Sequence, residues 1–360
     1  MNIKKLAALL TAALMCVMIA GCTAETAASG ESSAQPSPTP TPKVGIEAVF
    51  DKPVTLAIVS NGDEEASALF FGAAVREAES MGVTVSTMAA GSGFDTEVGK
   101  AAANADAVVA FLPEAVTDYA AFEALEKPVA VFEAGKGSAP EGLSYLDYNP
   151  DGELNAALDA ALNYPPHEAP VRLILLFKSA DSPAYAAYQQ LFSEGKIFPK
   201  EIYIAADEQT GAGDWLTEKL GGYVEGMLDA VFAEDTELAI SACDALAALN
   251  RTDMEVFCPG VTPDIVSRME QGPDVFAQGI GRNDALSGML CVRAALQMLH
   301  GGEAVTQTFE PAVINAADFG DDAVAAMSAA DSEKAALYNA DWMDTLRSYY
   351  AEAADASAVK

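Results

Sequence analysis

Histidine is scarce in this chain, with two residues in 360. His167 follows two prolines and His300 precedes two glycines, so we expect both in loops or at helix ends. Neither belongs to a His-Glu-x-x-His or Cys-x-x-Cys arrangement, so no zinc or other metal site is expected. No Gly-x-Ser-x-Gly sequence is present either, which argues against a serine nucleophile activated by histidine.

Positive charge is also scarce. The chain has 20 Lys and Arg against 53 Asp and Glu, a formal net charge of −33. A phosphate backbone or an anionic membrane surface is bound through clustered cations, so nucleic acid is not an expected partner. We expect a solvated, self-repelling acidic surface that favours solubility, and the alternative is a field that attracts a cationic ligand.

The amino terminus has the pattern of an export signal. Lys4 and Lys5 precede an uncharged apolar stretch over residues 6–18, which is too short to span a membrane as a helix. The sequence Ile-Ala-Gly-Cys at 19–22 resembles the lipobox of bacterial lipoproteins. The resemblance implies a signal peptide over 1–21, a lipidated (palmitate-bearing) Cys22 and anchoring to the outer face of the cell membrane. The alternative is a plain signal peptide with a chance cysteine.

Residues 22–52 are expected to be a tether. They are rich in Ser and Thr, and prolines alternate with other residues over 36–42. Such a sequence favours an extended, poorly packed backbone. The folded part is therefore expected to begin at residue 53.

Few cysteines remain beyond this region. Cys16 falls in the signal and Cys22 at the lipobox, which leaves Cys243, Cys258 and Cys291. An odd number excludes a complete disulfide framework. Buried free thiols are the favoured interpretation, and a bridge between Cys243 and Cys258 is the alternative.

From residue 53 onward, short apolar runs alternate with amphipathic segments. Runs at 54–60, 83–89, 107–112 and 128–132 are separated by helical patterns, and the series restarts with a strong apolar run at 171–177. We expect a long helix over 215–232, a strand over 237–241, a helix over 284–299 and a helical tail over 321–354. Near-continuous apolar runs are typical of parallel strands that are buried on both faces. The prediction is an α/β chain with two similar doubly wound parallel-sheet lobes, joined by a hinge, with a ligand cleft between them.

This order of elements resembles the type I periplasmic binding proteins, the ribose- and galactose-binding class of solute receptors, over residues 53–315. The resemblance implies three crossings between the lobes. It assigns 53–147 and 279–304 to lobe one, and 148–278 and 305–360 to lobe two. Ligand would lie at the carboxyl ends of both sheets, as in other open α/β sheets. We also expect a monomer that needs no cofactor.

In lobe one, the resemblance assigns a ligand-binding role to two residues of this chain, and three of the family's ligand-binding residues are replaced. Asp63 falls where the family has a polar, sugar-facing residue, but the two aromatics expected next are Ala66 and Ser67. Glu133 falls where the family has the Asp of an Asp-Arg pair, and the Arg is replaced by Ala134. A simple pentose or hexose bound in the usual way is therefore not expected, because an unpaired buried hydroxyl costs about 1–3 kcal/mol.

In lobe two and at the second crossing, the family's ligand-binding positions fall on acidic, aromatic and amide side chains and on one cation, Arg282. Trp215 is expected to stack on the ligand, and the alternative is a core residue that anchors its helix. Each Asp could instead cap a helix. The remaining members of the set are Asp181, Tyr185, Asp244, Gln278 and Arg282.

The function that these residues and the resemblance favour is an extracytoplasmic solute receptor, working with an ABC-type permease. Its ligand would be a small polar molecule: sugar-like, nucleoside-like or cationic. One alternative is a lipoprotein that reports ligand to a membrane sensor. Another is a glycosidase-type enzyme with paired carboxylates, for which the sequence shows no clear acid/base motif. We expect no enzymatic activity.

Overall fold

The computed structural model describes residues 44–90, 93–113, 116, 118–135, 137–138, 140–164, 171–270, 276–314 and 338–358. The chain divides into two compact units, 1–42 and 43–360, and the second is described here. The expected signal peptide, Cys22 and most of the expected tether lie outside the described residues. No helix among the described residues is long and apolar enough to cross a membrane.

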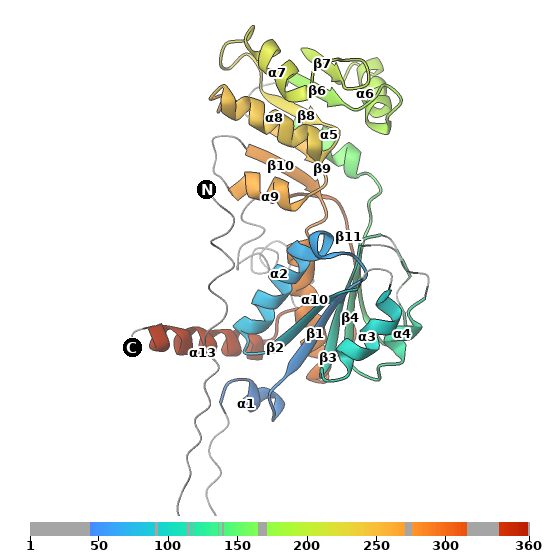
Figure 1. Ribbon diagram of the computed structural model, residues 1–360, viewed down its shortest axis with the longest axis vertical. Helices are drawn as coiled ribbons and strands as arrows, with labels where there is room; N and C mark the ends of the chain where they lie inside the picture. The colour runs from blue at the N-terminus through green and yellow to red at the C-terminus, as the bar shows by residue number, and fades with distance from the viewer. Residues whose placement is uncertain are drawn as a thin grey trace, which may run out of the picture. The chain divides into compact units, whose positions relative to one another are not determined.

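Two six-stranded sheets organise the second unit (Figure 1), as expected from the alternating sequence pattern. The first sheet is entirely parallel and has the order β11-β5-β4-β3-β1-β2. Its strands, with the helices packed on them, are called lobe one. They are β1 (Thr55–Ser60), β2 (Thr84–Ala89), β3 (Ala107–Leu112), β4 (Val129–Glu133), β5 (Ser144–Tyr148) and β11 (Thr306–Phe309).

The second sheet has the order β12-β10-β9-β8-β6-β7 and forms lobe two with its helices. All its strand pairs are parallel except β10 with β12, which is antiparallel. The strands are β6 (Leu173–Phe177), β7 (Glu201–Ile204), β8 (Ala230–Ala233), β9 (Glu255–Pro259), β10 (Phe276–Gly281) and β12 (Ala312–Ile314). The central strands β3 and β6 are buried along their whole length, because helices cover both faces of a parallel sheet.

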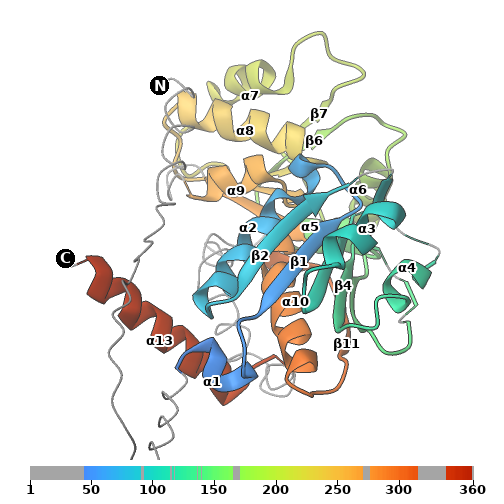
Figure 2. The same ribbon diagram turned by 60° about the horizontal axis from the view of Figure 1, so that its bottom comes forward.

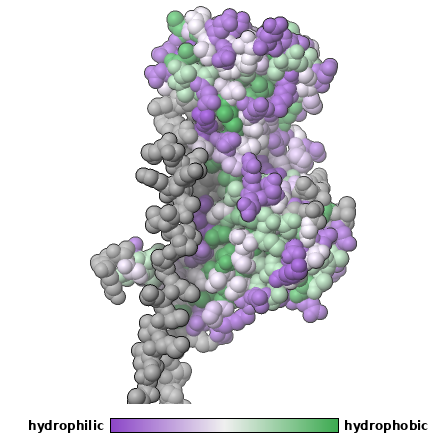
Figure 3. Space-filling model, in the orientation of Figure 1, coloured by the Kyte–Doolittle hydropathy of each residue, from purple (hydrophilic) through white to green (hydrophobic). Residues whose placement is uncertain are grey.

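Helices cover both faces of each sheet and complete four hydrophobic clusters (Figures 1 and 2). On lobe one, α2 (Glu64–Ser80) and α10 (Asp284–Leu299) pack on one face, and α3 (Phe94–Ala102) and α4 (Ala120–Glu123) on the other. On lobe two, one face carries α7 (Ala212–Leu220), α8 (Thr236–Ala248) and α9 (Pro263–Glu270), and the other carries α5 (Glu153–Leu162) and α6 (Pro183–Ser193). On the face in Figure 3, hydrophilic side chains cover much of the surface around α6, α7 and α8.

The chain crosses between the lobes at 149–152, 282–283 and 310–311. The first two crossings lie close to the expected positions. The assignment of 305–360 to lobe two is wrong for most of its described part, because β11 pairs with β5 in lobe one. The tail helix α13 (Asp341–Ala358) also belongs to lobe one, since Met343 and Leu346 are buried in the core beneath α2 and α10.

The folded part begins earlier than residue 53. Residues Ile46–Phe50 form the short helix α1, and Ile46 is buried in the lobe-one core. The Ile46 main-chain N–H donates to the Tyr350 hydroxyl of α13 over 3.1 Å, which joins the two ends of the described chain (Figure 2). Residues Ile46–Phe50 therefore belong to the folded part and not to the tether that was expected to extend to residue 52.

Two elements differ from the sequence-based expectation in lobe two. The helix expected over 215–232 ends at Leu220, before Gly221 and Gly222, and the apolar residues at its far end form β8. The strand expected over 237–241 is part of α8, because the Asp235 side chain accepts from the Leu238 N–H over 2.9 Å and starts a helix there. The cap at Asp235 therefore decided in favour of a helix, because the short apolar run at 237–241 is compatible with either a helix or a strand.

Candidate functional site

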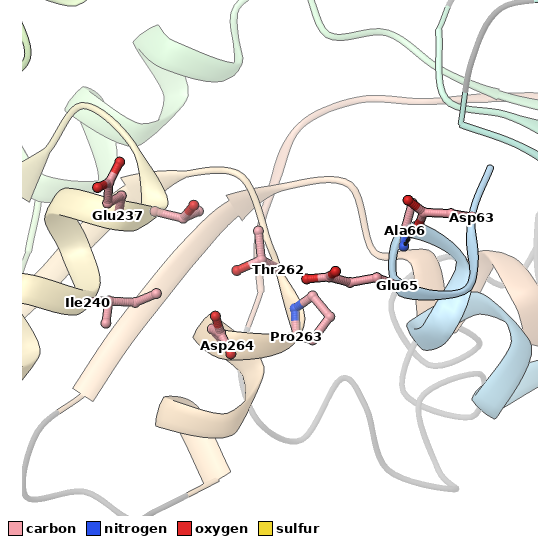
Figure 4. A pocket seen from close by; sticks show the side chains of 9 residues that line it. Asp63, Glu65, Ala66, Glu237, Ile240, Thr262, Pro263 and Asp264 are labelled. Carbon is pink, nitrogen blue, oxygen red and sulfur yellow. Dashed lines mark hydrogen bonds between the residues drawn. The ribbon is translucent and has the colours of Figure 1, made fainter.

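A pocket of about 480 Å³ lies where loops leave the carboxyl ends of three strands (Figure 4). One side is formed by the start of α2, which follows β1, and the other by the starts of α8 and α9, which follow β8 and β9. The pocket thus occupies the position at which open α/β sheets bind ligands, and its volume suits a small molecule. The lining residues are Asp63, Glu65, Ala66, Thr236, Glu237, Ile240, Thr262, Pro263 and Asp264.

The polar groups of the lining side chains are carboxylates and hydroxyls. Asp63 and Glu65 come from lobe one, and Glu237 and Asp264 from lobe two. None of the nine lining residues is basic or aromatic. An ionised carboxylate only accepts hydrogen bonds, so the lining favours ligand groups that donate them.

Helix geometry positions several of these side chains. Asp63 is the N-cap of α2, and its Oδ1 atom accepts from the Ala66 N–H over 2.8 Å. Thr262 precedes α9, and its Oγ1 atom accepts from the Ile265 N–H over 3.4 Å. These side chains stand at helix starts because a cap satisfies N–H groups that have no partner within the helix. The same capping leaves them at the mouths of the strand-to-helix loops, where a ligand can reach them.

One cation approaches the pocket from outside its lining. The Nζ atom of Lys178 lies 3.8 Å from Oε2 of Glu237 and forms a closer ion pair with Asp235. The Glu237 side chain is largely exposed, so this contact contributes little stability. Glu237 therefore remains accessible to ligand.

Of the eight ligand-binding residues predicted from the sequence, Asp63 lines this pocket. Glu133 does not, although it ends β4 as expected. Its side chain is 2% exposed, and its Oε2 atom accepts from the hydroxyls of Tyr119 and Tyr145. Burial and the hydrogen bond to Glu133 raise the pKa of Tyr119 to about 12, so this phenol stays protonated. Glu133 thus belongs to a hydrogen-bond cluster inside lobe one.

Trp215 is a core residue of lobe two, which is the alternative that the sequence left open. It is 6% exposed and belongs to the cluster beneath α7 and α8. Its ring centroid lies 5.2 Å from that of Tyr203, and Lys219 Nζ lies 5.6 Å above the indole. An indole held in this way anchors α7 to the sheet and does not reach the pocket lining.

Three more predicted residues lie elsewhere on lobe two. Asp244 lies within α8 rather than after a strand, and its exposed Oδ1 atom pairs with Arg268 Nη2 over 2.6 Å. Asp181 is exposed in the turn before α6. The half-buried Tyr185 ring packs edge-on against Phe177 of the lobe-two core, with centroids 5.2 Å apart. None of the three lines the pocket.

The last two predicted residues lie near the second crossing. Gln278 Nε2 donates to Glu255 Oε2 over 2.5 Å, within the lobe-two sheet. Arg282 donates from Nη2 to Asp284 Oδ2 over 2.9 Å, and its guanidinium lies 5.6 Å from the Phe111 ring centroid. Burial raises the pKa of Asp284, and Arg282 opposes this rise. Arg282 is thus engaged at the hinge and is absent from the pocket lining.

The charged pocket residues that the sequence did not predict share one signal. Glu65, Glu237 and Asp264 are acidic residues in the first turn of a helix that follows a strand. Such residues ordinarily interact with the helix dipole, so their role in a pocket emerges only when three helix starts converge. In addition, the first part of α8 was expected to be a strand over 237–241, so the ligand-binding residue was predicted after that strand, at Asp244, and not at the start of a helix.

The described residues show no metal centre. No group of three or more His, Cys, Asp or Glu is placed to hold a metal ion within that part of the chain. Cys243, Cys258 and Cys291 are free and buried, which confirms the interpretation as unpaired thiols.

Comparison with solved structures identifies the architecture. A sugar ABC transporter protein from Yersinia enterocolitica subsp. enterocolitica 8081 is 19% identical, with 86% of this chain and 99% of that chain covered and a TM-score of 0.50. The chain has the two-lobed fold of periplasmic solute-binding proteins. No family model matches it. No curated protein matches it either.

Two further structures have lower TM-scores, both 0.46. One is a periplasmic solute-binding protein of an ABC transporter from Actinobacillus succinogenes 130z with bound D-allose, 17% identical, with 74% of this chain and 99% of that chain covered. The other is an arabinose-binding protein from Geobacillus stearothermophilus, 14% identical, with 74% and 98% covered. These neighbours are binding proteins rather than enzymes. At such identities the likeness shows the fold alone.

Proposed function

We propose that this protein is a solute receptor that binds a small polar molecule in the pocket formed by the starts of α2, α8 and α9. The pocket itself carries the proposal, because it takes its lining from both lobes at the carboxyl ends of their strands. The three crossings at 149–152, 282–283 and 310–311 would serve as the hinge on which the lobes close.

Filling the pocket tests this proposal. Ala66 lines the pocket on the first turn of α2, and its exposed position accepts a larger side chain without disturbing the core. We expect Ala66→Trp to abolish binding of any solute found by thermal-shift screening of sugars, polyols, nucleosides, amino acids and amines. The unliganded melting temperature should stay close to that of the parent chain.

A matched variant serves as the control for this experiment. Ala247→Trp introduces the same side chain at an exposed position of α8 that does not line the pocket, and it should leave binding unchanged. Binding that survives Ala66→Trp would show that the solute site lies elsewhere.

We also propose that the receptor is a lipoprotein anchored through Cys22 to the outer face of the cell membrane. The support is the apolar stretch at 6–18 followed by Ile-Ala-Gly-Cys. Metabolic labelling with a palmitate analogue should mark the parent chain and not Cys22→Ala, with Cys16→Ala as the control that keeps its label. Labelling of Cys22→Ala would contradict the anchor.

The expected partner is an ABC-type permease, which receives ligand from the monomeric receptor. The support is that the similar structures include proteins named as parts of ABC transporters. Cross-linking in membranes should capture the permease in a ligand-dependent manner. Capture of a membrane sensor instead would favour the signalling alternative.

A further inference from the structure

We propose that the solute is a small organic dication, a chain with an ammonium group near each end. This inference rests on the proposed receptor function and names the ligand class of the same pocket. It departs from the neutral sugars of the structural neighbours, and it follows from how charge and apolar surface are distributed in the lining.

The first argument is the sign and amount of charge. Asp63, Glu65, Glu237 and Asp264 bring four negative charges to one pocket, and the lining contains no basic residue. Three helices of at least eight residues begin at the pocket, and each N-terminus contributes roughly half a positive charge. Lys178 lies 3.8 Å from Glu237 outside the lining, but it pairs more closely with Asp235, which is also outside the lining, so these two side chains add no net charge. An excess of roughly two to three negative charges therefore remains, which a ligand with two positive charges would neutralise.

The second argument is where the carboxylates lie. Asp63 and Glu65 stand on the α2 side of the pocket, whereas Glu237 and Asp264 stand on the α8 and α9 side (Figure 4). Each lobe therefore offers a pair of carboxylates. A molecule with one ammonium group would bind one pair of carboxylates and leave the other pair without a cationic group of the ligand. A molecule with two would link the lobes and favour their closure.

The third argument is the surface between the charges. Ala66, Ile240 and Pro263 contribute apolar surface to the lining, which suits the methylene groups that separate two amines. A sugar ring would require partners that also donate hydrogen bonds, and usually an aromatic face on which to stack. The lining side chains offer two hydroxyls, Thr236 and Thr262, and no aromatic ring.

A general attraction between an acidic chain and any cation is the competing explanation, because the net charge of the chain is −33. Variants that each remove one negative charge, inside or outside the pocket, distinguish binding in the pocket from this general attraction. Asp264→Asn and Glu65→Gln each remove one negative charge from the pocket, and Asp244→Asn removes one from an exposed position of α8 outside the lining. Asp63 is unsuitable for this purpose because it caps α2.

The experiment is calorimetric titration of the full chain with 1,4-diaminobutane, butylamine, 1,4-butanediol, D-allose and L-arabinose. We expect the diamine to bind with one site, butylamine at least about tenfold more weakly, and the neutral compounds not at all. Asp264→Asn and Glu65→Gln should each weaken diamine binding about tenfold, which is the loss of about one ionic contact, and Asp244→Asn should not. Raising the salt concentration should weaken binding in parallel.

Several outcomes would overturn the inference: no diamine binding, equal loss in all three charge variants, or butylamine binding as tightly as the diamine. Binding of a neutral sugar or polyol that Ala66→Trp abolishes would overturn the ligand class and leave the receptor function standing. Diamine binding that survives Ala66→Trp would instead contradict the pocket on which the receptor function rests.

Discussion

Arg293 and Glu77 form an ion pair inside lobe one, with Arg293 Nε 2.7 Å from Glu77 Oε1 and both side chains 4% exposed. The pair joins α10 to α2, and Arg347 of α13 reaches the same Oε1 atom over 3.2 Å. Burial lowers the pKa of Arg293, and the charge of Glu77 opposes this effect. One carboxylate thus holds together three helices that are far apart in the sequence.

Removing the Glu77 carboxylate should destabilise the folded protein. Glu77→Gln leaves the buried Arg293 guanidinium without a counter-charge, so the free energy of unfolding should fall by about 3–5 kcal/mol. Urea denaturation followed by circular dichroism measures the change. The control is Glu97→Gln, which breaks an exposed pair with Lys100 and should cost less than about 1 kcal/mol. Similar losses in both variants would contradict a stabilising role for the buried pair.

Trp215→Ala should destabilise lobe two without abolishing binding. The indole is buried against Tyr203, so its removal should cost about 3–5 kcal/mol. Ligand affinity, measured well below the melting temperature, should stay within about twofold of the parent value, because a uniform loss of stability does not change the pocket. Lys219→Ala, which removes only the cation above the ring, is the milder control. Normal stability with lost binding would return Trp215 to the ligand site.

Tyr119 should make stability sensitive to alkaline pH. Burial and Glu133 raise its pKa to about 12, against about 10 in the unfolded chain. The folded state holds this proton more tightly, so the stabilisation is complete below about pH 10 and disappears as the pH rises towards 12. The free energy of unfolding should therefore fall more steeply over this range in the parent chain than in Tyr119→Phe.

The exposed Tyr349 provides the control for this pH dependence. Tyr349→Phe should keep the slope of the parent chain between about pH 10 and 12, because Tyr349 lies on α13 and takes no part in the hydrogen bonds to Glu133. Equal slopes for the parent chain and Tyr119→Phe would contradict the role of the Glu133 cluster.

The three core thiols should be inert in the folded state. Burial raises the pKa of Cys243 to about 12, and it also raises the pKa of Cys258 and Cys291. Because the thiolate is the reactive form, iodoacetamide at about pH 8 should label none of them before unfolding and all three in urea. Peptide mass spectrometry locates the labels. Protection of Cys243 and Cys258 in urea that ends on addition of reductant would indicate a disulfide between them.

Much of the architecture was determined by the sequence itself. The runs that became β3 and β6 are continuous in apolar residues and that of β1 is nearly so, as burial on both faces requires. Helix α10 begins and ends where its pattern predicted, at Asp284 and Leu299. These features are local, since hydrophobic periodicity and caps are properties of neighbouring residues.

Tertiary structure decided what depends on contacts between distant residues. The pairing of β11 with β5 places residue 306 and its neighbours in lobe one, and no local pattern reports which sheet a short strand joins. The local sequence around Trp215 is compatible with a side chain that faces either the core or a ligand. Its packing against Tyr203 in the folded protein places it in the core. The pocket exists because helices that start more than 150 residues apart converge on one volume. Their acidic first turns are ordinary helix starts in the sequence and become a binding surface only when the lobes are assembled.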